Sequence, residues 1–506
     1  MNSKDINYNL FAIYIIKHFL VHNESSNIQI EILASQLNIE YLQLLTSLLN
    51  KENKKLSFDL LYILINIGFC DKGAELFGLD EKIIFNIGVF LGNNKNDTHL
   101  LYHGIWLLKN ISFKNDKICE ILLKYKIIDF FNEIYERHLL DNDFMKNLLS
   151  CIWDFISYKL NMKKKGDNDD PLCLIPSIKI IKTQLRPNLP PDLLNKYIYS
   201  LYNLTFFNSF DIYLNMTNNK MHKELMNIYP IIIGKIDELN IIKKEYESKK
   251  NLINDIKEEE KYKKLLKNIE NYKCIILMIL KILGKMMSLD EGILTQTLID
   301  SGIANFYNYV LQSNDIKIIK NASFGISNIC AGAYGQISCL YEKNTFIELI
   351  KVTKNIYEAL EYNSKLKNVY FSELKDAFRE INFVFSLAII NSIYEKSIPL
   401  VKYDNFVVVL FLIKALNILN DNGYEELIKY ILSALYKLII YDRGEQKKNN
   451  ENNKDNNYLD IIEFMEINGI KEYLEKLKSN MNEEIVDKSE IIYNCIFNNL
   501  EVEQDL

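Results

Sequence analysis

An apolar stripe with helical spacing recurs along the chain. Large apolar residues return at i, i+3, i+4 and i+7, as in FDLLYILINIGF (58–69) and LYHGIWLLKNIS (101–112), the pattern of a helix that buries one face. Within each stripe a large, mostly aromatic residue stands four positions before Asn or a residue that replaces it. Residues four apart lie on the same face of a helix. We call the two positions of each such pair ladder positions. In chain order the pairs are Tyr62 and Asn66, Trp106 and Asn110, Trp153 and Ser157, Tyr199 and Asn203, Leu280 and Gly284, Phe324 and Asn328, Phe383 and Leu387, and Ser433 and Lys437.

The stripes return with a regular period. Asn66, Asn110, Ser157 and Asn203 are separated by 44, 47 and 46 residues. Repeats of roughly 40 to 47 residues, with two or three helices each, are typical of armadillo and HEAT arrays. The 506 residues include only 17 Gly and 7 Pro, which disfavours a turn-rich β fold. We therefore predict an all-α fold, a right-handed α-solenoid of about ten armadillo repeats over residues 1–500.

Three segments depart from the repeat. The residues from 235 to 271 are highly charged and lack an apolar stripe, so they are either a degenerate repeat or a solvated helical insertion, and the missing stripe favours the insertion. The polar, low-complexity residues from 442 to 457 predict a disordered loop. The residues from 458 to 500 read as amphipathic helices with a charged outer face, which a terminal capping repeat requires.

Charge and cysteine usage restrict the partners. Sixty basic and 66 acidic residues give a net charge of −6, without the basic surplus of a nucleic-acid binder. The 8 Cys are scattered, without metal-ligand spacing, as expected for buried thiols in a reducing compartment. Every apolar run is shorter than the roughly 18 residues of a membrane span. We expect a soluble intracellular protein that binds neither nucleic acid nor membrane.

The sequence contains no recognisable catalytic motif. The 6 His form no nucleophile, base or metal-ligand pattern with Cys, Ser or carboxylates, and the chain has no glycine-rich phosphate loop. The sequence therefore predicts a protein that is not an enzyme and has no catalytic, cofactor or metal site.

Two longer stretches carry a family resemblance. The residues from 272 to 337 include ISNICAG (326–332), and the tail runs GIKEYLEKLKSNMNEEIVDKSEIIYNCIF (469–497). Together with the period and the ladder pairs, they resemble importin alpha, the armadillo-repeat adaptor family that recognises nuclear localisation signals. The resemblance extends over essentially the whole chain, with low similarity at many single positions.

The resemblance implies two peptide sites along a concave groove. In the family, the ladder asparagines bond the backbone of an extended peptide, and the aromatic faces hold the stems of Lys or Arg, with cation–π attraction at the tips. The major site would comprise Tyr62, Asn66, Trp106, Asn110, Trp153, Ser157, Tyr199 and Asn203. A weak minor site would comprise Phe324, Asn328 and Phe383, beside the acidic residues Asp290 and Glu380.

Several positions depart from the family pattern. Ser157, Gly284 and Leu387 stand where the family has asparagine, and each lost hydrogen bond weakens binding by roughly 0.5 to 1.5 kcal/mol. Lys114 stands where the family has an acidic residue, and its charge would repel a peptide lysine. We expect altered recognition at the major site and little at the minor site.

The resemblance also implies partners and a location. They are basic, signal-bearing cargo proteins, importin beta and an export receptor, in cytoplasm and nucleus. The opening residues contain no Arg or Lys cluster of the kind that binds importin beta in the family, which argues against importin beta by the usual route unless the N-terminus is truncated.

Two hypotheses remain open from the sequence. The first is a divergent importin-alpha-like adaptor for basic peptides in nuclear import. The second is an armadillo scaffold that has lost signal recognition and binds folded partners. The ladder aromatics and asparagines also have plain interpretations, as core aromatics and ordinary polar positions, and Asp290 and Glu380 as solvated carboxylates. Phe206, Phe207 and Phe210 are expected in the core.

Overall fold

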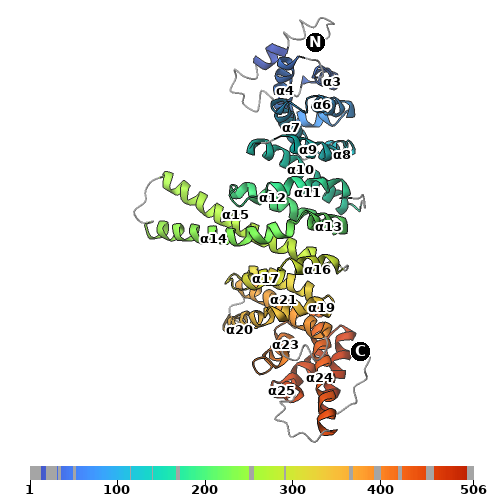
Figure 1. Cartoon of the computed structure of the whole chain (residues 1–506), viewed down its shortest axis with the longest axis vertical. Helices are drawn as coiled ribbons and strands as arrows, with labels where there is room; N and C mark the ends of the chain where they lie inside the picture. The colour runs from blue at the N-terminus through green and yellow to red at the C-terminus, as the bar shows by residue number, and fades with distance from the viewer. Residues whose placement is uncertain are drawn as a thin grey trace. The chain divides into compact units, whose positions relative to one another are not determined.

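The structure is a computed structural model of the whole chain (Figure 1). It describes residues 13–18, 31, 36–49, 53–113, 115–138, 141–166, 171–249, 256–289, 292–363, 369–392, 400–419, 424–451 and 461–498. Throughout these ranges the regular elements are helices, and none of the described residues lies in a strand. The all-α prediction is confirmed.

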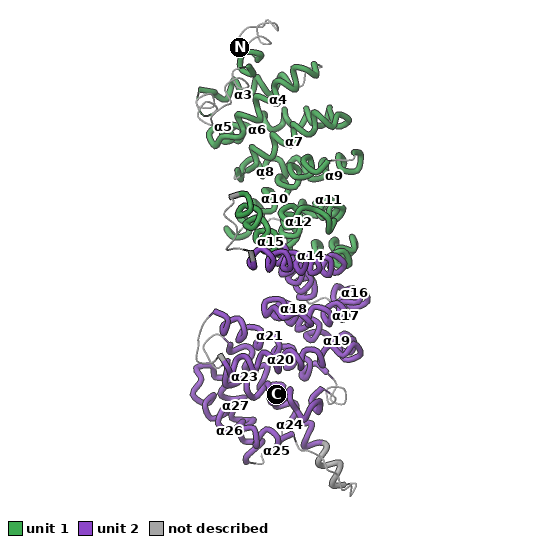
Figure 2. The backbone as a smooth tube through the Cα atoms, turned by 90° about the vertical axis from the view of Figure 1, so that its left-hand side faces the viewer, with its two compact units in different colours: residues 1–224, 253–271 green, residues 225–252, 272–506 purple. Residues whose placement is uncertain are grey.

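The chain divides into two compact units, coloured separately in Figure 2. The first unit comprises residues 1–224 and 253–271, and the second comprises residues 225–252 and 272–506. The helices of the first unit are α3 (Ile39–Leu48), α4 (Lys54–Phe69), α5 (Asp71–Phe77), α6 (Glu81–Asn93), α7 (Thr98–Ser112), α8 (Asp116–Lys124), α9 (Ile127–Arg137), α10 (Asn142–Lys164), η1 (Pro171–Leu174), α11 (Pro176–Thr183), α12 (Pro191–Leu204), η2 (Thr205–Phe207) and α13 (Phe210–Asn218).

The long helices α14 (Met221–Lys249) and α15 (Ile256–Met286) carry the charged stretch 235–271 and cross the unit boundary. The remaining helices belong to the second unit. They are α16 (Ile293–Asp300), α17 (Ile303–Val310), α18 (Ile316–Cys330), α19 (Tyr334–Glu342), α20 (Thr345–Asn363), α21 (Val369–Asn391), α23 (Val407–Ile418), α24 (Glu425–Glu451), α25 (Ile461–Ile467), α26 (Ile470–Leu477) and α27 (Glu483–Phe497).

Each ladder helix of the first unit begins at a residue suited to a helix start. Asn53, Asp97 and Asp141 are the N-caps of α4, α7 and α10, and their side chains accept hydrogen bonds from backbone N–H groups of the first turn, which satisfies donors that have no helical partner. In α12, proline occupies the first turn, where its missing N–H is not needed. The apolar stripe of each helix is then buried, as the periodicity predicts.

The ladder helices lie side by side within each unit. In the first unit α4 packs on α7, α7 on α10 and α10 on α12 (Figure 1). Side chains brace successive repeats by donating to backbone carbonyls: Asn110 Nδ2 to Ile65 O at 3.1 Å and Asn132 Nδ2 to Pro176 O at 2.9 Å, across 45 and 44 residues of sequence. These separations reproduce the period of the sequence pattern.

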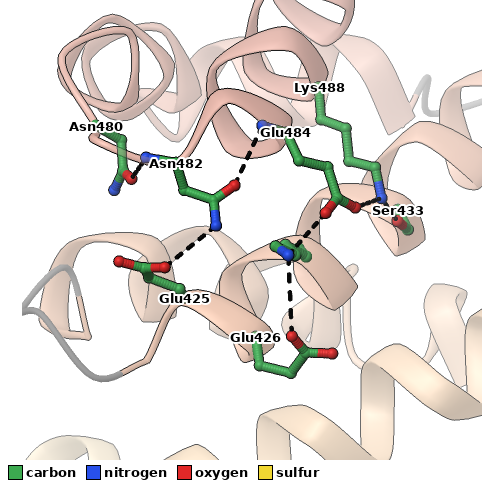
Figure 3. Close-up of polar contacts among 8 residues, drawn as sticks. Glu425, Glu426, Ser433, Asn480, Asn482, Glu484 and Lys488 are labelled. Carbon is green, nitrogen blue, oxygen red and sulfur yellow. Dashed lines mark hydrogen bonds and ion pairs between the residues drawn. The ribbon is translucent and has the colours of Figure 1, made fainter.

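The second unit repeats this arrangement with α18, α21, α24 and α27. Its last contact, between α24 and α27, combines apolar packing with a polar cluster (Figure 3). Glu484 accepts from Lys429 at 2.7 Å and pairs with Lys488 at 3.0 Å, while Lys488 Nζ reaches Ser433 Oγ at 3.0 Å. Ser433 is a ladder position, so α27 covers part of the ladder face of α24.

Two expectations from the sequence differ from the structure. Helix α24 ends at Glu451, so residues 442–451 of the predicted loop are helical, while residues 452–457 lie outside the described ranges. Phe207 is buried, but Phe206 is 42% exposed, and the expectation that Phe206 belongs to the core is wrong.

Candidate functional site

The first unit contains a groove of about 790 Å³ formed by α4, α5, α7, α10 and α12. Its apolar lining consists of Phe69, Phe113, Leu149, Trp153 and Tyr199. Phe69 is 63% and Phe113 58% exposed. Aromatic side chains so open to water favour contact with a partner, because covering a large apolar side chain stabilises a complex by roughly 1.5 to 3 kcal/mol.

Trp153 and Tyr199 form one continuous aromatic wall of the groove. Their ring centroids are 4.7 Å apart and the ring planes are inclined by 25°. An aliphatic stem between two rings needs a contact distance of roughly 3.5 to 4.0 Å on each side, so no side chain fits between these two. A lysine or arginine stem would lie along the open side of the wall, and the slot expected between successive aromatic ladder positions is closed here.

Asn110 is the ladder asparagine that lines the groove. Its Nδ2 already donates to Ile65 O. A primary amide has two N–H donors and one carbonyl acceptor, so one N–H and Oδ1 remain for a ligand. Asn66 is used similarly, since its Nδ2 donates to Tyr62 O within its own helix at 2.7 Å.

Asp154 is a nearly buried carboxyl at the groove. It is 9% exposed, and one oxygen accepts a hydrogen bond from Ser112 Oγ at 2.9 Å. Burial raises the pKa of this carboxyl to about 7, although Ser112 and the charge of Lys109 act in the opposite direction. The carboxyl is therefore close to half ionised at neutral pH, and a second cation beside it would favour the ionised form.

The other polar side chains of the groove are Asp71, Lys109, Ser150, Asn195, Lys196 and Ser200. Lys109 and Lys196 form no ion pair within the described residues. Asn195 Oδ1 is a buried acceptor without a donor among the described residues, and such a group gains stability when a donor reaches it. The groove thus combines aromatic faces, amides, two carboxyls and two lysines.

Only part of the predicted major site meets in this groove. Asn110, Trp153 and Tyr199 line it. Tyr62, Asn66, Trp106 and Ser157 are half-buried and outside its lining; the Trp106 ring instead packs beside Tyr102 on its own helix, with centroids 6.0 Å apart. Asn203 is 7% exposed, so the expectation that it extends the accessible row is wrong. Lys114 lies outside the described residues.

In the second unit, side chains of the protein itself occupy the space beside several ladder positions. A Cβ built on Gly284 would meet the Phe324 ring at 2.8 Å, so the ring lies directly on the glycine. Asn328 Nδ2 donates to Gly284 O at 2.9 Å. Leu280 and Leu387 are 0% and 5% exposed, and these two ladder positions belong to the core.

The remaining minor-site residues have partners inside the chain. Phe383 is half-buried and meets Tyr430 edge to face, with centroids 4.8 Å apart. The Glu380 carboxylate, 16% exposed, forms an ion pair with Arg379, so it is not an open acidic partner for a peptide lysine. Asp290 lies outside the described residues.

Sequence reasoning missed several groove residues. Phe69 and Phe113 each stand three residues after a ladder asparagine, and that repeated offset was a signal that could have found them. Asp154 gave none, because it meets its hydrogen-bond donor Ser112, 42 residues away in sequence, only through the packing of α10 on α7. Lys109 and Lys196 resemble any other helical lysine in the sequence.

Comparisons with known proteins show the fold. No family model matches the chain, and no curated protein matches it in sequence. A solved structure of an engineered protein from a structural genomics consortium is similar over 98% of this chain and 96% of that chain, with a TM-score of 0.59 and 13% identity. A structure from work on a phosphorylation switch in the cadherin and beta-catenin interaction is similar over 98% of this chain and 82% of that chain, with a TM-score of 0.60 and 12% identity.

A shorter likeness is to a designed armadillo repeat protein in complex with the peptide (KR)4. It covers 63% of this chain and 99% of that chain, with a TM-score of 0.40 and 16% identity, too low to carry an inference. The two longer likenesses bear out the predicted all-α solenoid and an armadillo-like fold.

Two further properties concern the described residues alone. None of their helices combines the length and the apolar character needed to span a membrane. Nor do three or more of their His, Cys, Asp and Glu side chains gather as they would around a metal ion.

Proposed function

We propose that the first unit binds an extended segment of a partner protein in the groove beside α7, α10 and α12. The observation that carries the proposal is the meeting of the Asn110 amide with the Trp153 and Tyr199 wall in one groove of about 790 Å³. The free N–H and Oδ1 of Asn110 match the alternating acceptors and donors of a peptide backbone. The wall offers an apolar face for side-chain stems.

We further propose that the protein is a divergent adaptor of the importin alpha type, which carries cargo with basic signals between cytoplasm and nucleus. The resemblance of residues 272–337 and 469–497 to that family motivates this step. Asp154 and Asp71 at the groove supply carboxyls for a cationic tip. Importin beta and an export receptor are the further partners that such a role requires.

Fluorescence titration tests peptide binding directly. The chain contains only two tryptophans, so Trp106→Phe leaves Trp153 as the one reporter, at the groove wall. A peptide that occupies the groove should change its emission saturably, with a Kd below about 10 μM for a basic signal peptide. Tyr199 is 42% exposed, so Tyr199→Ala should keep the fold and weaken binding at least about tenfold.

Tyr62→Ala is the matched control. Tyr62 is an aromatic ladder residue outside the groove lining, and its replacement should change the Kd by less than about twofold. Equal losses in Tyr62→Ala and Tyr199→Ala, with circular dichroism unchanged, would contradict a binding site at this groove.

The scaffold hypothesis is the second candidate. It is favoured by the internal bonds of the asparagine ladder, because the amides of Asn66, Asn110 and Asn328 all donate to carbonyls of the chain itself. If no extended peptide of any composition perturbs Trp153 at 100 μM, a folded partner becomes the better explanation.

A further inference from the structure

The groove that we propose as a peptide site has an unusual balance of aromatic and charged groups. Three of its exposed side chains are aromatic: Phe69 at 63%, Phe113 at 58% and Tyr199 at 42%. Phe69 is the last residue of α4, and Phe113 is the C-cap residue that directly follows α7. An occupant that left these rings facing water would lose the main apolar contact available to it.

The charges of the groove offer one place for a cation. Asp154 Oδ1 accepts no hydrogen bond within the described residues; the one donor to this carboxyl there is Ser112, which donates to Oδ2. This side chain is nine-tenths buried and lines the groove. An unpaired oxygen on a nearly buried carboxyl is a strong acceptor for a single ammonium or guanidinium group.

A second cation nearby would meet repulsion. Lys109 on α7 and Lys196 on α12 also line the groove and make no ion pair within the described residues. Like charges within one groove repel each other, and salt screens this repulsion only beyond a Debye length of about 8 Å at physiological ionic strength. An unbroken run of lysines would place several positive charges against these two, with only Asp71 and Asp154 to offset them.

The aromatic wall leads to the same conclusion. A row of separate slots would hold one cationic stem in each, but Trp153 and Tyr199 stack on each other and leave no slot between them. The wall therefore accommodates apolar side chains laid along it as well as it does the stem of a lysine.

We propose that the groove selects an extended segment in which one cationic residue lies among aromatic or aliphatic ones, and that it rejects an unbroken polybasic run. This inference rests on the proposed peptide-binding function and narrows its ligand class: the basic signals of the adaptor proposal would carry one cation among apolar residues rather than a run of lysines. The cation pairs with Asp154, apolar side chains cover Phe69 and Phe113, and Lys109 and Lys196 exclude neighbouring cations.

Three eight-residue peptides test the selection with the Trp106→Phe protein. One has a single Lys among Leu, Phe and Ser; the second has Gln in place of that Lys; the third is octalysine. The single-lysine peptide should bind at least about tenfold tighter than octalysine and about fivefold tighter than the Gln peptide. Asp154→Asn should abolish the preference for Lys over Gln.

Replacing the groove lysines Lys109 and Lys196 gives a separate test of the selection. Lys109→Ala with Lys196→Ala should tighten octalysine binding by at least about fivefold and change single-lysine binding by less than about twofold. Phe113→Ala should weaken binding of the single-lysine peptide, because it removes an apolar contact, and should leave the affinity for octalysine unchanged. Thermal melts of each variant separate these effects from loss of folding.

The outcomes distinguish the inference from the function beneath it. Octalysine binding more tightly than the single-lysine peptide would overturn the inference and leave the peptide-binding function intact. Failure of all three peptides to perturb Trp153 would overturn both.

Discussion

The two units present the same helical ladder with different consequences. In the first unit, Asn110, Trp153 and Tyr199 border an open groove of about 790 Å³. In the second unit, the Phe324 ring lies on Gly284, and the Lys437 ammonium donates to the backbone of the preceding repeat, including Ser392 O at 2.9 Å. In the second unit, side chains of the chain itself therefore lie against these ladder positions.

The difference shows why one ladder face is open and the other is filled. Both units keep an asparagine that braces one repeat on the previous one, through Asn110 to Ile65 O and Asn328 to Gly284 O. A ladder asparagine therefore stabilises the stack whether or not a peptide lies beside it. In the second unit, the small residue Gly284 leaves room for the Phe324 ring of the next ladder helix, and that ring fills the space beside the ladder. The size of the residue at a ladder position therefore affects whether the ladder face is open.

The largest expected effect comes from the carboxyl at the open groove. Asp154 has a folded pKa of about 7, against an ordinary value of 3.8. Between these values the unfolded chain releases the proton first, so the free energy of unfolding falls as pH rises and levels off above pH 7. At about 1.36 kcal/mol per pKa unit, this carboxyl alone should contribute a loss of roughly 2 to 3 kcal/mol between pH 5 and pH 8. His222, whose pKa burial lowers to about 4, acts in the opposite direction below its ordinary value of 6.5, so the expected result is a difference between wild type and Asp154→Asn that shrinks by roughly 2 to 3 kcal/mol over this range.

Urea unfolding followed by tryptophan emission measures this difference, because Trp106 and Trp153 both lie in the first unit. Asp143 on the same helix is exposed, with 72% of its side chain accessible, and Asp143→Asn is the matched control that should keep the pH dependence. A pH profile identical in wild type and Asp154→Asn would show that the carboxyl is not held protonated by burial.

The next effect tests whether glycine closes the second ladder. Gly284→Asn restores the family's residue, but its Cβ would meet the Phe324 ring at 2.8 Å. Overpacking of this kind costs about 1 to 3 kcal/mol. We expect a lower melting temperature by circular dichroism and faster hydrogen exchange in α15 and α18.

Gly88 serves as the control for this substitution. It also lies inside a helix, α6, and a Cβ there meets nothing within 4 Å, so Gly88→Asn should change stability little. Combining Gly284→Asn with Phe324→Ala should recover part of the loss, because the small side chain removes the clash. A Gly284→Asn protein as stable as wild type would mean that the ring moves freely and the ladder is not closed by packing.

The sequence predicted the helices and their period well, for a physical reason. The stripe around Asn110 and the one around Asn328 each bury one face, and a repeating buried face imposes a repeating spacing. That spacing returns in the hydrogen bonds from these asparagines to the preceding repeat, across 45 and 44 residues. Helix type and stacking are local or nearest-neighbour properties, and the sequence encodes them directly.

The site was less predictable because it depends on contacts between repeats. Trp106 and Trp153 occupy equivalent ladder positions, yet only Trp153 lines the groove and stacks on the next aromatic residue. Asn203 matches Asn110 in the pattern but is buried. Neither distinction is visible along one helix, since each depends on how closely neighbouring helices approach.

The smallest expected effect concerns how the second ladder ends. Lys488 and Glu484 of α27 reach Ser433 and Lys429 of α24 (Figure 3), while Ile485 and Ile492 of α27 are buried. Because exposed ion pairs contribute little, Glu484→Gln should lower the melting temperature by less than about 2 °C at low salt, and by less at 1 M NaCl, where the Debye length is about 3 Å. Glu472→Gln, which removes an ion pair within α26 alone, is the control. A loss of melting temperature several times larger, seen for Glu484→Gln but not for Glu472→Gln and abolished by salt, would contradict this expectation. It would mean that ion pairs rather than apolar packing hold α27 on α24. The second ladder would then differ from the open groove through its charges and not through its packing.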